Sequence, residues 1–521
     1  MNIFKKIQDR FEAINPNIRF VFWLLLFSVI YNYPSILVKR PQSVHHWRQA
    51  DCASLALNYY QTGMHFFQPQ THNLTSDNNT SGYCTTSEIP VSYYVIACLY
   101  KIFGYHDFIF RFVNTLIFLT GLLYLFKACN LLFNNTFWST LIVLFFFTSP
   151  VLVYYGNNFL TDSSALAFTF IAWYFFIKFY LNNHQKLFYI SMLFFLLAGA
   201  YKISALLSLV AILIVFISES AGILRVKNKG KLFSKPIVCT VSFLLVFSII
   251  GLWVYFAKSY NSLHGSGYFS TGIFPLWNLD KTKIQMVTKN IKELWLNQYY
   301  YVYSLYFFTA IFLFTIFYIK KGNRFLMTIN ILVLIGSSIY VVLWFWTLKD
   351  HDYYTINLYI LLVFVFINFI WLIKAQFPKA YASKYLKILF IGFLLLNLNH
   401  ARKQMKERYN SWWTEYPEYK DYHTITPYLR SIGIAPLDTV ICLPDMSHFT
   451  LYLMNQRGWT ECLGNNSDST AIATSIKHGA KYLIVNGEDI LTRNYLKSFL
   501  NNPAGQFHSI KIFKLSQTIN R

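Results

Sequence analysis

Acidic side chains near the ends of long apolar runs are the residues that could do chemistry in this sequence. Asp51 follows Arg48 in the stretch HHWRQAD (45–51), and Glu88 precedes Pro90 in the same polar region. Ionisable groups are costly beside hydrocarbon, so those that persist there are functional candidates. One carboxylate can take a proton from an incoming nucleophile while another orients the acceptor or holds a cation. The pair Asp51 and Glu88 therefore suits a transferase.

Three basic residues could bind an anionic leaving group. Arg48 could hold a phosphate with its two-pronged guanidinium, and Lys202 could bind it as a point charge. Lys202 could equally extend toward lipid headgroups. Arg111 could reach a phosphate, although an i,i+4 pair with Asp107 is the default interpretation. The sequence leaves these alternatives open.

Helix capping is the structural alternative for the acids. Asp162 could contact substrate or a metal, or it could be the N-cap of the apolar run that follows it. Asp51 could be a solvated cap at a helix start, and Glu88 could be a capping carboxylate. Spacing alone does not choose between a chemical and a capping role.

A cluster of polar residues before a later apolar run exceeds what capping requires. We interpret its members as ligands for substrate or metal: Asp350, His351, Asp352 and Tyr353. A divalent metal ion held by Glu88, His351 and a neighbouring carboxylate is chemically allowed. These ligands would come from remote segments and no spacing rule supports them, so the metal stays an open alternative and no other cofactor is expected.

Membrane spans are the elements that must position these groups. The 521 residues are 55% hydrophobic and only 13% charged. Runs such as 18–38, 237–257 and 354–373 each hold roughly 20 mostly apolar residues, enough to cross about 30 Å of hydrocarbon. This excludes a soluble enzyme, a disordered chain and a disulfide-rich mini-domain. The net charge of +23 lies mainly in short loops, so we expect membrane lipids as partners and no nucleic acid.

Hydropathy and charge together predict the topology. We count about eleven spans: 18–38, 108–127, 137–155, 163–181, 187–200, 203–218, 237–257, 299–319, 325–347, 354–373 and 385–399. Lys5, Lys6 and Arg10 before the first span place the amino terminus in the cytoplasm. The segments 39–107, 258–298 and everything after about 400 then face outward. We expect a multi-pass protein of a bacterial inner membrane with its active site on the periplasmic side.

The last 120 residues change character. Their apolar runs shrink to strand length at 439–443, 482–485 and 509–515, with helix-like stretches between them, which indicates a small α/β domain. The predicted fold is thus a polytopic all-α membrane domain over 1–400 and an outward-facing soluble α/β domain over 401–521. The first outer loop, 39–107, should contain two amphipathic helices lying along the membrane surface, one holding Asp51 and one over 91–103.

Seven scattered cysteines do not form a disulfide framework. Cys52 with Cys84, or Cys442 with Cys462, could pair in an oxidising compartment. Free buried thiols are the alternative. The chain also lacks a Walker A motif, which argues against an ATP-driven pump.

The order of these features resembles the GT-C superfamily of integral-membrane glycosyltransferases, in the branch similar to protein O-mannosyltransferases and the lipid A aminoarabinose transferase. The resemblance covers about residues 15–400 in architecture. It rests on these elements in order: WRQAD (47–51), SEIP (87–90), Arg111, Asp162, GAYK (199–202), HDYY (351–354) and a terminal α/β domain.

The resemblance implies transfer of a hexosyl or pentosyl group from a polyprenyl-phosphate carrier to a lipid, glycan or protein acceptor on the outer face. It implies that Asp51 is the catalytic carboxylate, Glu88 a second acid for acceptor or metal, and Lys202 and Arg48 ligands of the donor phosphate. Arg48 precedes Asp51, whereas the corresponding arginine of the aminoarabinose enzymes follows the acid. The alternatives are a polysaccharide polymerase or ligase and a lipid-linked glycan transporter or flippase; charges at span ends disfavour the transporter.

Overall fold

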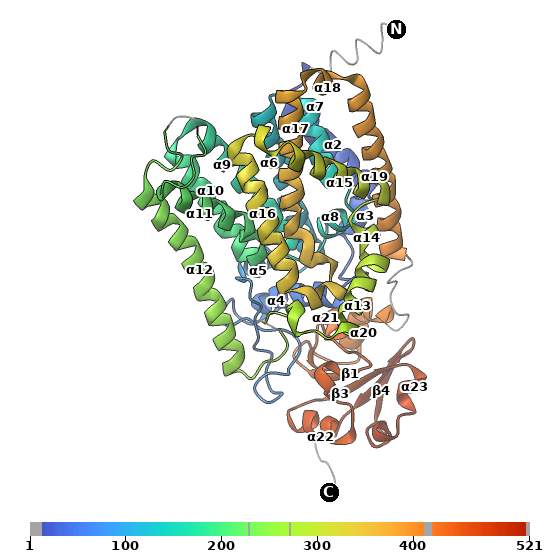
Figure 1. Cartoon of the computed structure of the whole chain (residues 1–521). Coiled ribbons are helices and arrows are strands. Elements are labelled where there is room, and N and C mark those ends of the chain that lie inside the picture. The colour runs from blue at the N-terminus through green and yellow to red at the C-terminus, as the bar shows by residue number, and fades with distance from the viewer. Residues whose placement is uncertain (1–12, 228–229, 270–271, 411–418, 517–521) are drawn as a thin grey trace. The chain divides into compact units, whose positions relative to one another are not determined.

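The computed structural model describes residues 13–227, 230–269, 272–410 and 419–516 (Figure 1). Lys5, Lys6 and Arg10, on which the predicted orientation depends, lie outside the described residues. The chain divides into two compact units. Unit 1 comprises Met1–Leu37, Phe112–Leu252 and Gly272–Met405, and unit 2 comprises Val38–Arg111, Trp253–Thr271 and Lys406–Arg521.

Apolar helices make up unit 1, as the hydropathy predicts. Its helices, three of which continue into unit 2, are α2 (Pro16–Ile30), α3 (Tyr33–Leu37), α6 (Asp107–Phe133), α7 (Thr136–Phe146), α8 (Pro150–Tyr155), α9 (Asp162–Asn182), α10 (Gln185–Tyr201), α11 (Leu207–Ser220), α12 (Pro236–Leu263), α13 (Lys281–Asn290), α14 (Leu296–Tyr299), α15 (Val302–Phe317), α16 (Arg324–Leu343), α17 (Tyr359–Gln376), α18 (Pro378–Ala382) and α19 (Lys384–Asn410). The polytopic helical architecture is confirmed.

Six helices of the described residues are long and apolar enough to cross a membrane, or seven if the pair Lys281–Tyr299 and Val302–Phe317, bent by 88°, is one span. Two predicted spans are broken. The first divides at Asn32, whose φ of +60° lies in the left-handed region just before Pro34, and the third divides before Pro150, because proline cannot continue the helical hydrogen bonds. The count of about eleven spans stays a prediction.

Aromatic packing holds the helices of unit 1 together. α9 lies along α10 (Figure 1), and the fully buried Trp173 of α9 donates from its indole nitrogen to the Ser208 hydroxyl at 3.0 Å. The ring of Trp173 also meets that of Phe364 at 4.6 Å. Buried aromatic pairs of this kind add to the area that they remove from lipid or water. The ends of these helices carry the polar residues considered below.

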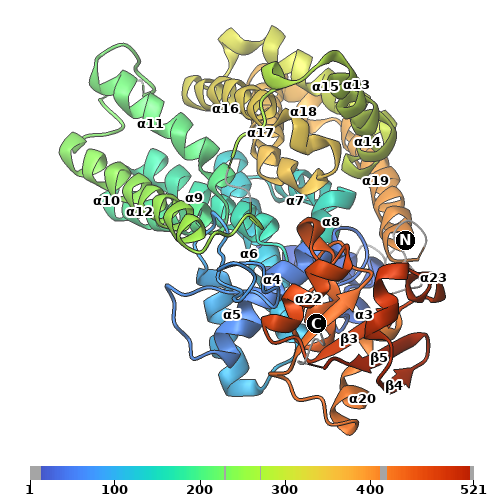
Figure 2. The same ribbon diagram turned by 90° about the horizontal axis from the view of Figure 1, so that it is seen from below.

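Unit 2 contains the predicted α/β fold. Its five strands are β1 (Thr439–Leu443), β2 (Arg457–Trp459), β3 (Tyr482–Asn486), β4 (Pro503–Phe507) and β5 (Ile510–Lys514). They lie in the order β2-β1-β3-β5-β4. β1 pairs in parallel with β2 and with β3, whereas β5 pairs antiparallel with β3 and with β4. Figure 2 shows β3, β5 and β4 next to one another. The accompanying helices are α20 (Thr426–Ser431), α21 (Phe449–Met454), α22 (Ser469–Lys477) and α23 (Glu488–Leu491).

The first loop is built into this α/β fold. Gly458 of β2 donates its amide to the His72 carbonyl at 3.0 Å and accepts from the Leu74 amide at 2.8 Å. The Trp459 indole donates to the Leu74 carbonyl at 3.0 Å, and the Leu74 side chain belongs to the core that includes Ile441. The loop therefore covers the outer edge of β2, which would otherwise expose unpaired backbone groups.

The helices of the first loop are α4 (His46–Gln61) and α5 (Val91–Phe103). Both were expected to be amphipathic helices on a membrane surface. For α4 this prediction is wrong, because every residue from Gln49 to Tyr59 is buried within the protein. α5 has one buried face and exposes apolar side chains such as Ile102. All seven cysteines are free thiols, so neither candidate disulfide is formed.

Candidate active site

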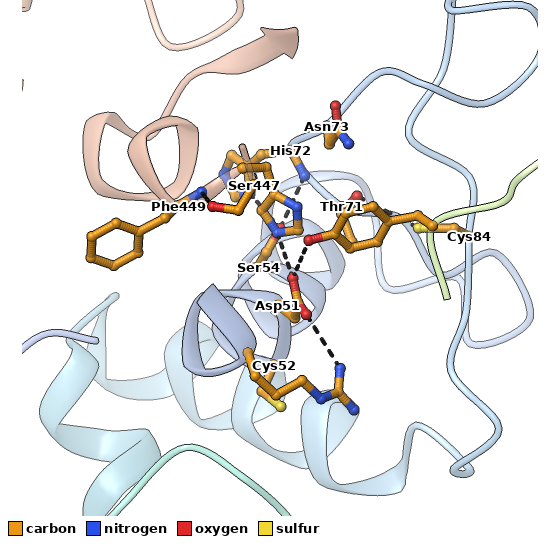
Figure 3. A network of polar contacts seen from close by, with 12 residues as sticks. Asp51, Cys52, Ser54, Thr71, His72, Asn73, Cys84, Ser447 and Phe449 are labelled. Carbon is orange, nitrogen blue, oxygen red and sulfur yellow. Dashed lines mark hydrogen bonds and ion pairs between the residues drawn. The ribbon is translucent and has the colours of Figure 1, made fainter. Parts of the chain in front are cut away.

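One turn of α4 brings together the first two predicted residues of the site. Arg48 and Asp51 are three positions apart on one helical face, with Nη1 of the arginine 3.5 Å from Oδ2 of the aspartate. Glu88 lies just before α5, which packs against α4, and its Oε2 is 3.7 Å from Arg48 Nη2. Asp51 is 1% exposed and Glu88 4%. Arg48 thus contacts two buried carboxylates. Figure 3 shows Asp51 with the groups that approach its carboxylate.

The two acids determine the charge state of Arg48. Burial alone would lower the pKa of the guanidinium, but Cys52, Glu88 and Asp51 act in the opposite sense and hold this pKa well above its usual value. Arg48 therefore stays a cation at any pH at which the protein is folded.

The candidate metal ligands lie in separate parts of the chain. No group of three or more His, Cys, Asp or Glu within the described part of the chain is arranged to hold a metal ion. Glu88 and His351, which were considered together as ligands, belong to different units. A divalent metal held by both of them therefore stays a prediction.

Two residues that the sequence did not identify also contact Asp51. The Tyr268 hydroxyl donates to Oδ1 at 2.8 Å, and Nε2 of His448 lies 3.1 Å from the same oxygen. Their rings meet at 4.9 Å. Burial lowers the pKa of His448 and raises that of Tyr268 well above its usual value, so both groups are uncharged at neutral pH.

A signal for His448 was present in the sequence. It follows the strand predicted at 439–443, and ligands of open α/β sheets bind beyond the carboxyl ends of parallel strands. Tyr268 lies in the long segment 258–298, where no periodicity or motif marks it. Its position depends on the packing of the end of α12 against the first loop: the Asn261 side chain exchanges hydrogen bonds with the backbone of Thr85 at 2.8 Å each.

A second set of polar contacts joins α4 to His72. The Ser54 hydroxyl and the Asn58 side-chain amide both donate to Nδ1 of His72, at 2.7 and 3.1 Å. Burial, together with the nearby His448 and Arg457, lowers the pKa of His72 to about 3. A neutral imidazole that accepts through Nδ1 is the state these donors require. Figure 3 shows Ser54 and His72 above Asp51 on the same side of the helix.

Arg111 is fully buried and supports the start of the first loop. Its Nε donates to the Lys39 carbonyl at 2.7 Å, and Nη2 donates to the Arg40 carbonyl at 3.2 Å and to the Gln49 side chain at 3.3 Å. Asp107, the expected partner of Arg111, forms an ion pair with Arg40 at 3.1 Å. These contacts favour a structural role for Arg111.

The remaining candidates lie in unit 1. Asp162 begins α9, and Lys202 follows the last residue of α10; Nζ of the lysine is 3.4 Å from Oδ1 of the aspartate. Lys202 also lies over the ring of Tyr354, 5.2 Å from its centroid, and 6.0 Å from that of Tyr353. A cation between an acid and aromatic faces is stabilised by both. Lys202 thus does more than extend toward lipid headgroups.

The cluster at 350–353 separates into exposed and buried members. The fully buried Asp352 accepts a hydrogen bond from the Tyr155 hydroxyl at 2.6 Å, and Tyr155 was not predicted. Nδ1 of His351 is 3.1 Å from the Thr347 carbonyl. Asp350 is half exposed and pairs with Lys349 at 3.0 Å.

Six of the predicted site residues, together with residues that were not proposed individually, form two clusters; Arg111, Asp350, His351 and Asp352 lie outside both. We call Arg48, Asp51, Glu88, Tyr268 and His448 the aspartate cluster, in unit 2. We call Asp162, Lys202, Tyr353 and Tyr354 the lysine cluster, in unit 1. Their convergence on one outer cavity stays a prediction.

Comparison with known proteins places these clusters in a recognised fold. Residues 87–255 match the family described as dolichyl-phosphate-mannose-protein mannosyltransferase. ArnT from Cupriavidus metallidurans bound to undecaprenyl phosphate superposes with a TM-score of 0.58 over 95% of this chain and 98% of that chain, at 10% identity. The chain has the GT-C glycosyltransferase fold. The predicted resemblance is therefore confirmed at the level of the fold.

Two further solved structures share this GT-C fold. The Archaeoglobus fulgidus oligosaccharyltransferase in complex with zinc and sulfate has a TM-score of 0.56 at 10% identity, covering 88% of this chain and 67% of that one. The arabinofuranosyltransferase AftD from Mycobacteria has a TM-score of 0.55 at 12% identity, covering 95% of this chain and 40% of that one. No curated protein sequence matches the chain.

Proposed function

We propose that the protein is a membrane glycosyltransferase that moves a sugar from a polyprenyl-phosphate carrier to an acceptor on the outer face of the membrane. The observation that carries this proposal is the aspartate cluster within a GT-C fold: the buried Asp51 carboxylate is flanked by the Arg48 guanidinium, which also faces Glu88. The similar ArnT structure holds undecaprenyl phosphate, a carrier of the proposed class.

In the proposed reaction, Asp51 acts as the general base. The acceptor hydroxyl attacks the anomeric carbon of the donor while Asp51 takes the hydroxyl proton. The bond between that carbon and the phosphate oxygen breaks, and its electron pair remains on the phosphate. General-base catalysis of this kind contributes typically about 10²- to 10⁴-fold in rate.

The basic residues would stabilise the charge that develops on the leaving phosphate. Arg48 keeps its charge because carboxylates lie on both sides of it, and Lys202 offers a compact ammonium beside Asp162 and two tyrosine rings. Fixed cations stabilise a developing oxyanion more strongly in a water-poor site than in water. Glu88, on the far side of Arg48 from Asp51, is the candidate to orient the acceptor.

The test is a direct assay of transfer. Membranes that contain the protein are incubated with a panel of radiolabelled hexosyl and pentosyl polyprenyl phosphates, and the labelled products are separated into lipid, glycan and protein fractions. We expect one donor to label one fraction, with release of unlabelled polyprenyl phosphate. Membranes with an Asp51→Asn variant at equal abundance provide the background. If no donor of the panel gives more product with the wild type than with this variant, the proposal is wrong.

A further inference from the structure

The histidine that contacts Asp51 belongs to the C-terminal α/β fold and is held there rigidly. His448 lies between the end of β1 and the start of α21. The fully buried Asp445 carboxylate fixes this turn, because it accepts hydrogen bonds from the Ser447 amide at 2.7 Å and from the Thr450 amide and hydroxyl at 2.9 and 2.7 Å. The backbone of His448 is therefore defined by the sheet and not by the first loop.

The helix after His448 is anchored to the first loop. The ring of Phe449 lies 4.5 Å from that of His46 at the start of α4, and the Leu453 carbonyl accepts from Arg40 at 3.0 Å. The Tyr452 hydroxyl donates to Asp107. These contacts fix α21 against α4, so the imidazole of His448 is brought to Asp51 by packing.

The imidazole is buried without regular hydrogen bonds. His448 is 1% exposed, and within the described residues neither ring nitrogen has a well-aligned hydrogen-bond partner. Nε2 is close to Asp51 Oδ1, at 3.1 Å, but its N–H is turned away from the line between the two atoms. A buried polar group left in this state costs free energy. Catalytic hydrogen bonds are often misaligned before substrate binds and tighten in the reacting complex.

Different side chains lie beside the two oxygens of the Asp51 carboxylate. Oδ1 faces Tyr268 and His448, which are neutral donors, and Oδ2 faces Arg48. The hydrogen bond from Tyr268 constrains the rotation of the carboxylate at Oδ1, and a second neutral donor from His448 would fix it. A fixed rotation aims a lone pair at one position of the incoming hydroxyl.

We propose that His448 is a positioning residue for Asp51, so that the C-terminal α/β fold supplies part of the catalytic apparatus. This inference rests on the proposed function, in which Asp51 takes the proton of the acceptor. The Nε2–H of His448 turns toward Oδ1 when the acceptor is bound and holds the carboxylate for proton abstraction. The α/β fold thus couples acceptor binding to the reaction.

Two substitutions test the contributions of the N–H group and of the ring of His448 separately. His448→Gln keeps an N–H that can reach Oδ1 but loses the ring that packs on Tyr268. His448→Phe keeps a ring of similar shape but has no donor. We expect kcat of transfer to fall about tenfold or more in His448→Phe, with the donor KM within about twofold of the wild type, and to stay within about threefold of the wild type in His448→Gln.

The control is His423→Gln, which alters a half-buried histidine of the same unit whose ring contacts Phe449 at 6.0 Å. We expect this variant to transfer at a rate within about twofold of the wild type. If His448→Phe is as active as His448→Gln, or if both lose activity equally, His448 acts through packing and the inference is overturned. If the wild type itself transfers no sugar, the proposed function fails, which is a different result.

Discussion

The aspartate cluster and the lysine cluster differ in the groups that surround their charged side chains. In the aspartate cluster, one arginine faces two carboxylates, and Asp51 also accepts a hydrogen bond from Tyr268 and lies 3.1 Å from Nε2 of His448. In the lysine cluster, Lys202 faces Asp162 and lies over tyrosine rings. The aspartate cluster thus combines its cation with carboxylates on two sides, whereas the lysine cluster combines its cation with aromatic faces.

The two clusters also differ in how the chain builds them. The lysine cluster uses residues at or next to helix ends, where each polar group follows or precedes an apolar run. The aspartate cluster needs the first loop, the segment after α12 and the turn after β1. Residues that depend on three remote segments are positioned only when the whole unit is folded. Unit 2 should therefore be the more sensitive of the two to substitutions far from its site.

The largest effect is expected from Arg48→Met, which leaves Asp51 and Glu88 buried without their shared cation. Breaking a buried ion pair by removing one partner costs about 3–5 kcal/mol. We expect chemical denaturation of the purified protein to show a loss of this size, together with loss of transfer. Arg48→Lys is the matched control, since it restores the charge and should recover most of the stability. Equal stability of Arg48→Met and the wild type would show that the two acids are not ionised together.

The second-largest effect is expected at the edge strand β2, and it tests whether the stability of unit 2 depends on that strand. Gly458 has a φ of +158°, and a Cβ there would lie 1.8 Å from the Val440 carbonyl oxygen, so β2 must move away from β1 and disturb its contacts with the first loop. We expect Gly458→Ala to destabilise unit 2 by about 2–3 kcal/mol and to speed proteolysis of the first loop. Gly433→Ala is the control, because Gly433 also has a positive φ but meets no atom within 4 Å. Similar behaviour of the two variants would contradict the proposed clash.

The lysine cluster can be tested with a pair of substitutions. Lys202→Met should weaken donor binding about tenfold, which is about 1.4 kcal/mol, and should also lower kcat, because the ammonium is proposed to stabilise the charge that develops on the phosphate. It should also destabilise unit 1, because Asp162 keeps its charge without that ammonium. In the double variant Asp162→Asn/Lys202→Met, stability should recover and donor binding should not. Donor binding that recovers in the double variant would mean that Lys202 serves only the fold.

The smallest effect is a pH dependence confined to unit 2. Burial lowers the pKa of His72 to about 3 and that of His423 to about 4. The unfolded chain, with histidine pKa values near 6.5, therefore binds more protons below that pH than the folded chain does, and stability falls on acidification. Between pH 7 and pH 6 we expect a loss of under about 1 kcal/mol per histidine. Pulse proteolysis at the two pH values measures it, and His72→Gln should reduce the slope.

The sequence was sufficient for the elements that local rules determine. Long apolar runs predicted the helices, and strand-length runs predicted β1, β3 and β5, because both depend on hydrophobic periodicity. Arg48 and Asp51 could be paired from their helical spacing. The breaks before Pro34 and Pro150 were missed, because mean hydropathy over a run does not register a single proline.

The rest of the site depends on long-range packing. Nothing local distinguishes Tyr268 or Tyr155 from the other tyrosines among the 39 in the chain. The burial of α4 was missed because the covering segments lie far away along the chain, among them the turn at His448 and the helix α21 that follows it. The sequence therefore identified the charged residues of the site but not the neutral donors that hold them.

The most direct test of the account compares donor binding with transfer in Asp51→Asn. Asparagine is close in shape to aspartate and can still contact Arg48 and Tyr268, but it cannot take a proton at neutral pH. We expect the purified variant to bind the labelled polyprenyl-phosphate sugar as tightly as the wild type does, and to transfer the sugar at least about 100-fold more slowly. Transfer within about tenfold of the wild-type rate, in a variant that binds donor normally, would contradict the role of Asp51 as the base.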